Sequence, residues 1–93
     1  MSYKAILFSL DGKWTTDYKA KTIREVWNLV DDRGSRWVFY PIVGIIKDNG
    51  ATNKMQRVIE MCIGFRHLEG KNIKTISNWI REHPGEPYTL INA

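Results

Sequence analysis

Apolar and polar residues alternate near the start of the chain in a pattern that predicts a β-hairpin. Residues 3–10 form a short apolar run that ends at Asp11-Gly12. Residues 13–20 then alternate, with the aromatic side chains in one set and Lys and Asp in the other, which is typical of a half-buried strand. An Asp-Gly pair between two extended runs favours a tight type I′ turn, which needs positive φ at both central positions.

The next stretch has the spacing of an amphipathic helix. Thr22 and Glu25 match a capping box, in which the two side chains satisfy free backbone amides at a helix start. The apolar residues that follow repeat at i, i+3, i+4 and i+7 on one face. They are Ile23, Val26, Trp27 and Val30.

A second helix is expected at residues 72–83, before Pro84-Gly85. Its apolar face is formed by Ile73, Ile76 and Ile80. The tail that follows, residues 86–93, is expected either to dock loosely on the domain or to fray.

The middle of the chain is harder to interpret. Residues 35–46 are rich in aromatic and β-branched side chains and are expected to be extended, with Pro41 at an edge or a bulge. Residues 53–63 fit either a helical face or a strand that returns against residues 37–46. We favour the strand, because a long unpaired strand would expose an edge that is prone to aggregation.

These elements predict one α+β domain that spans residues 1–93, a length that suits a single domain. The expected order is β-β-α-β-(β)-α. The sheet is expected to be small and mainly antiparallel, with the N-terminal hairpin and one or two further strands. Both helices are expected to pack on one face of it and to meet there in a shared core.

The charge of the chain is basic and unevenly placed. Lys and Arg number 14 against 10 Asp and Glu, a net charge of +4. The segment 54–81 alone holds six basic and two acidic residues and so accounts for the whole excess. Such an excess suits an anionic partner, although a solvated surface is the simpler interpretation.

Cysteine content and the N-terminus point to a soluble cytoplasmic protein. Cys62 is the only cysteine, which excludes an intramolecular disulfide and fits a reducing compartment. The N-terminus lacks the features of a signal peptide. The longest uncharged stretch has ten residues, too few to span a membrane.

The sequence carries no motif of a catalytic site. Cys62 with His67 or His83 is the one pair that suits nucleophilic chemistry, but the spacing fixes no geometry between them. Two histidines and one cysteine match no zinc spacing, and no glycine-rich phosphate loop occurs. We therefore expect no enzyme activity, metal or cofactor, with thiol-dependent activity at Cys62 as the alternative.

A basic stripe on the last helix suits nucleic acid. Its members recur at i, i+3, i+7 and i+10, beside the isoleucine face. Lys and Arg contact phosphates, and Asn and Arg can also read base edges. The full candidate set is Arg57, Arg66, Lys71, Lys74, Asn78 and Arg81.

Aromatic side chains suggest a protein-binding surface. Two helices on one face of a sheet leave the other face open, so some aromatic surface is expected to stay exposed, as in many binding faces. The candidates are Trp14, Tyr18, Trp37 and Tyr40. The favoured function is therefore a small non-enzymatic accessory module that binds another protein or a second copy of itself. Nucleic-acid binding through the basic stripe is the alternative.

Overall fold

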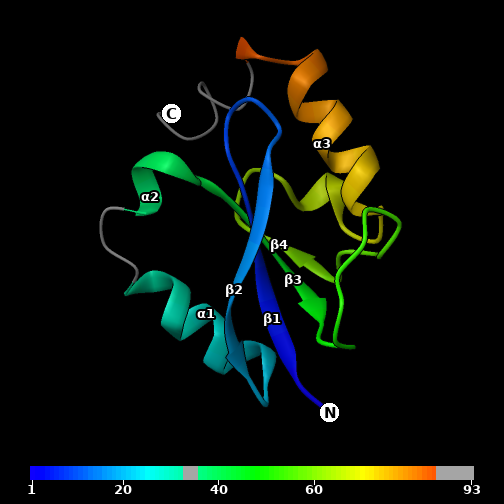
Figure 1. Ribbon diagram of the computed structural model, residues 1–93. Coiled ribbons are helices and arrows are strands. Elements are labelled where there is room, and N and C mark those ends of the chain that lie inside the picture. The colour runs from blue at the N-terminus through cyan, green and yellow to red at the C-terminus, as the bar shows by residue number, and fades with distance from the viewer. Residues whose placement is uncertain (33–35, 86–93) are drawn as a thin grey trace.

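A computed structural model of the protein describes residues 1–32 and 36–85. Its elements, in chain order, are β1 (Tyr3–Phe8), β2 (Trp14–Ala20), α1 (Ile23–Asp31), α2 (Arg36–Phe39), β3 (Ile42–Lys47), β4 (Glu60–Met61), the 3-10 helix η1 (Arg66–Leu68) and α3 (Ile73–Glu82). The four strands form one antiparallel sheet in the order β2-β1-β3-β4 (Figure 1). The predicted α+β class and the order of its main elements are confirmed.

Strand β1 lies inside the sheet and is buried on both of its faces. It pairs with β2 along one edge and with β3 along the other. Its alternate side chains enter two separate cores: Ile6 and Phe8 belong to one, and Ala5 and Leu7 belong to the other.

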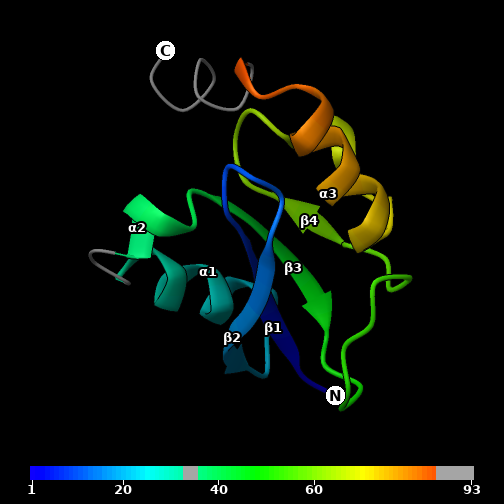
Figure 2. The same ribbon diagram turned by 45° about the horizontal axis from the view of Figure 1, so that its top comes forward.

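The two long helices cover opposite faces of the sheet (Figure 2). Val26 of α1 packs in the core with Leu7, whereas Ile76 of α3 packs in the core with Ile6. The prediction that both helices share one face and one core is therefore wrong. The reason is visible in β1 and in β3, where apolar residues follow one another without alternation. Such strands are apolar on both faces, and another element must pack on each face to bury it.

Both helices begin at the residues that the sequence indicates. The Thr22 hydroxyl accepts a hydrogen bond from the Glu25 backbone N–H at 3.1 Å and donates one to the Glu25 carboxylate at 2.9 Å. At the start of α3, the Asn72 side chain accepts from the backbone N–H of Thr75 at 2.8 Å. These caps satisfy amides that a helix start would otherwise leave unpaired.

The aromatic stretch is only partly extended. Residues 36–39 form the short helix α2, and the strand β3 begins at Ile42, after Pro41. The single extended segment predicted for residues 35–46 is therefore wrong. Proline cannot continue a helix and keeps the residue before it out of the helical region, so Pro41 separates the two elements.

Residues 53–63 contain only the two-residue strand β4. The strand predicted there is confirmed at Glu60–Met61, which pairs with β3, and the rest of the segment is irregular. The tail, residues 86–93, lies outside the described residues.

The hairpin is present, but its turn is longer than predicted. The Ser9 N–H donates to the Lys13 carbonyl at 2.9 Å and the Gly12 N–H donates to the Ser9 carbonyl at 3.1 Å. Gly12 has a φ of 83°, whereas Asp11 is not among the described residues with positive φ. The type I′ turn is therefore wrong, and the loop is of the three-residue kind that ends on a left-handed glycine.

The hairpin tip docks on α3. The buried Ser77 hydroxyl donates to the Gly12 carbonyl at 2.6 Å. A Cβ atom at Gly12 would lie 2.9 Å from the Ser77 carbonyl oxygen and 2.9 Å from Arg81 Cγ. Only glycine combines the positive φ with this close approach. The contact fixes the orientation of α3 over the sheet.

Strand β2 contains a bulge at Tyr18. The pairing shifts between Ala5↔Asp17 and Tyr3↔Ala20, and Tyr18 has a φ of 59°. The extra residue reverses the alternation. Trp14 therefore packs on the core of α3, whereas Tyr18 packs on the core of α1.

Candidate binding surface on helix α3

Helix α3 turns a polar side outward because its apolar side is fully used in the core. Ile73, Ile76 and Ile80 are completely buried, and Ser77 is nearly so. The outer side carries Lys74, Thr75, Arg81 and Glu82, all exposed, and the half-buried Asn78.

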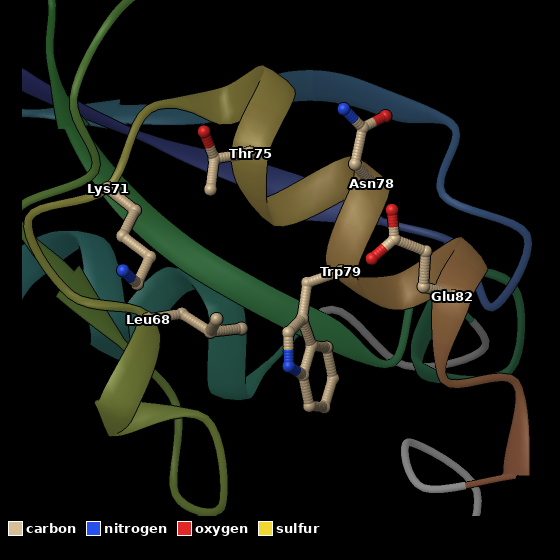
Figure 3. A pocket seen from close by; sticks show the side chains of 6 residues that line it. All are labelled: Leu68, Lys71, Thr75, Asn78, Trp79 and Glu82. Atoms are coloured by element: carbon tan, nitrogen blue, oxygen red, sulfur yellow. The ribbon is translucent and has the colours of Figure 1, made fainter.

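A shallow groove of about 290 Å³ runs beside this outer side (Figure 3). Thr75, Asn78 and Glu82 lie along the helix, while Leu68 and Lys71 come from the segment before it. The groove is lined by Leu68, Lys71, Thr75, Asn78, Trp79 and Glu82. Its apolar members are Leu68 and Trp79. Its charged members are Lys71, which is positive, and Glu82, which is negative.

Trp79 is held in place by three rings. Its indole stacks on His83 with ring centres 4.5 Å apart, and it meets His67 and Phe65 edge-on at 5.1 Å and 6.2 Å. The His83 Nδ1 atom lies 2.7 Å from the Trp79 carbonyl oxygen. Such ring pairs favour one geometry, so the indole forms a fixed wall of the groove.

The structure brings together part of the predicted basic stripe. Lys71 and Asn78 both line the groove, and Arg81 donates from Nη1 to the Asn78 Oδ1 atom at 3.2 Å. Lys74 is exposed on the same helix, and its backbone N–H donates to the Lys54 carbonyl at 2.8 Å.

The two further residues of the predicted nucleic-acid set lie away from α3 in the sequence. Arg57 donates to the Gly70 carbonyl at 3.0 Å, and Arg66 is exposed on η1. Glu82, which sequence reasoning missed, places a carboxylate in the groove. Its position four residues after Asn78, on the same side of the helix, was the signal that could have found it.

The four predicted aromatic residues do not form one surface. Trp14 is half-buried against the core of α3, and Tyr18 and Tyr40 are half-buried against the core of α1. Trp37 lies in α2, and its side chain is outside the described part of the structure. The most exposed large apolar side chains in that part include Ile63, Val38 and Phe39, with exposed fractions of 86%, 75% and 66%.

The residues considered for thiol chemistry have packing roles. Cys62 is half-buried against the core of α3, and its Sγ accepts from the Val43 N–H at 3.5 Å. His67 and His83 both contact Trp79. Within residues 1–32 and 36–85, no group of three or more His, Cys, Asp or Glu side chains could hold a metal ion. In that same part of the chain, every helix is too short or too polar to cross a membrane.

Asp48 is the centre of an ionic cluster at the other end of the sheet. Its carboxylate lies 2.9 Å from Lys19 Nζ and 3.4 Å from Lys4 Nζ, and it accepts from the Gly50 N–H at 3.3 Å. The Lys19 hydrogen bond is the main cause that lowers the pKa of Asp48 to about 2, against the opposing effect of desolvation. The cluster ties β1, β2 and the end of β3 together.

Comparison of the chain with known protein families, with curated proteins and with solved structures finds no match.

Acid should weaken the fold through Asp48. Its folded pKa of about 2 lies below the ordinary value of 3.8, so its contribution is complete at neutral pH and is lost as the pH falls from about 4 to 2. We expect Asp48→Asn to lower the free energy of unfolding at pH 6 and to flatten its decline in acid. Urea unfolding of both proteins between pH 6 and pH 2 measures this, and parallel pH profiles would contradict it.

Proposed function

We propose that the protein is a small non-enzymatic binding module that holds a segment of a partner protein in the groove beside α3. The observation that carries the proposal is the composition of the groove. The half-buried Trp79 offers apolar surface, with the buried Leu68 at its base, and Lys71 and Glu82 offer opposite charges beside it. An apolar centre with a polar border is the usual anatomy of a protein interface.

The size of the groove suits a side chain of a partner. Ligand pockets usually measure about 300–1,000 Å³, and this groove, at about 290 Å³, is just below that range. Thr75 and Asn78 add hydroxyl and amide groups that can bond to a peptide backbone. Because the ring cluster holds Trp79 in place, little side-chain entropy is lost when a partner binds.

Nucleic-acid binding is the second candidate, and the exposed cations on α3 and just before it favour it. Lys71, Lys74 and Arg81 are exposed and make no ion pair with any other described residue. Such side chains suit a phosphate backbone. The carboxylate of Glu82 in the groove would repel a phosphate there, and we therefore rank this candidate second.

Filling the groove should abolish partner binding. Thr75 is exposed, so Thr75→Arg adds bulk in the groove without touching the core. We expect proteins retained from a nuclease-treated lysate by the immobilised wild type to fall about tenfold or more with Thr75→Arg.

The matched control for this variant is Asn28→Arg, which adds the same charge at an exposed position of α1. It should retain the same proteins as the wild type. If Thr75→Arg also retains them at the wild-type level, the groove is not the binding site.

Charge reversal on α3 tests the second candidate. If it holds, the wild type retains labelled single- or double-stranded nucleic acid at about 50 mM salt and loses it by orders of magnitude at about 200 mM. Lys74→Glu with Arg81→Glu should abolish retention. Lys21→Glu with Arg24→Glu makes the same charge change at exposed positions near the start of α1 and should retain most of it. Equal loss from both pairs, or no binding by the wild type, would remove this candidate.

A further inference from the structure

Strand β2 forms one edge of the sheet and presents backbone groups to the outside. The Ser9 N–H donates to the Lys13 carbonyl, so these residues form a hydrogen-bonded pair at the start of the ladder with β1. In an antiparallel ladder, bonded and non-bonded pairs alternate. Trp14 and Thr16 therefore direct their N–H and C=O groups away from β1. No other described segment pairs with this edge.

The regular part of this edge is short, and it carries one positive and one negative side chain. It runs from Lys13 to Asp17, because the bulge at Tyr18 interrupts the strand after that. Lys13 and Asp17 are both exposed, and they lie on the same face, two residues on either side of Thr15. Natural sheets commonly protect an edge with charge and with bulges. Here the charge before Thr15, on Lys13, is positive, and the charge after it, on Asp17, is negative.

We propose that a second copy of the chain pairs with this edge, antiparallel and centred on Thr15. In that register Trp14 lies opposite Thr16 of the second copy, so the outward backbone groups of both strands meet. Lys13 lies opposite Asp17 of the second copy, and the two-fold axis repeats this pair. Opposite charges placed across two strands stabilise their pairing.

Neighbouring registers do not fit the sequence. Centring on Trp14 sets Asp11 against Asp17 and draws the turn at Gly12 into the ladder. Centring on Thr16 sets Trp14 against Tyr18, where the bulge breaks the pairing. The register centred on Thr15 uses only regular strand and places only opposite charges face to face.

Helix α1 adds an apolar contact to this arrangement. A two-fold axis normal to the sheet places α1 of both copies on the same face. Trp27 lies on one flank of α1, and its Nε1 donates to Glu60 of β4, the opposite edge of the sheet, at 3.1 Å. Leu29 lies on the other flank and is 43% exposed. It therefore points toward the side of β2, where the second copy would lie.

This dimer uses a surface separate from the groove beside α3, and it does not depend on the proposed function. It would join two four-stranded sheets into one continuous sheet. The interface is isologous, so each contact occurs twice.

Sedimentation equilibrium over a range of protein concentrations tests the dimer. We expect a concentration-dependent dimer of the wild type. Lys13→Asp alone and Asp17→Lys alone should each weaken it about tenfold or more, because each sets like charges opposite one another twice. An equimolar mixture of the two variants should form a heterodimer, and the double variant should dimerise like the wild type. Lys47→Asp, an exposed control on β3, should not change the dimer.

A cross-linking experiment keeps the test decisive if either charge variant folds poorly. In a Cys62→Ser background, Thr15→Cys should form a disulfide-linked dimer under mild oxidation, because Thr15 faces its own copy across the axis. Lys47→Cys in the same background should not. A wild type that stays monomeric at every concentration, or a mixture that fails to restore association, would overturn the proposal.

Discussion

The burial of β1 on both faces is the constraint on which the rest of the structure depends. Five consecutive residues of this strand, Lys4 to Phe8, are buried, so neither face can be left to solvent. One helix must cover each side, and the chain supplies α1 for one and α3 for the other. Lys4 is the buried cation of the strand, and its ammonium group is held by Asp48 and by the Gly50 carbonyl. That pairing offsets the cost of removing a charge from water.

The position of the candidate groove follows from the same constraint. Because α3 must cover the face that carries Ile6 and Phe8, its inner side is apolar and its outer side is free for polar groups. The Ser77 bond to the hairpin tip then fixes how the helix lies on the sheet. The irregular segment after β4 brings Leu68 against Trp79, which completes the groove. A binding surface on a firmly packed helix is held in shape before a partner arrives.

The sequence predicted what depends on local chemistry and missed what depends on tertiary packing. The helix caps at Thr22 and Asn72 are local; the first was predicted as a cap, and the second helix was predicted to begin at Asn72. The bulge at Tyr18 and the helical turn before Pro41 were also missed. The placement of the two helices on opposite faces depends on contacts between distant segments. The same holds for the site: Lys71 and Asn78 were predicted from helical spacing, whereas the contribution of Leu68 requires the fold of the preceding loop.

The most direct test of this account is the pattern of methyl–methyl nuclear Overhauser effects between the helices and the sheet. We expect the methyl groups of Val26 to show cross-peaks to those of Leu7, and the methyl groups of Ile76 to show cross-peaks to those of Ile6. No cross-peak should join Val26 to Ile76, because the sheet lies between them. Cross-peaks between the methyl groups of these two helices would place both on one face and contradict the two-sided core.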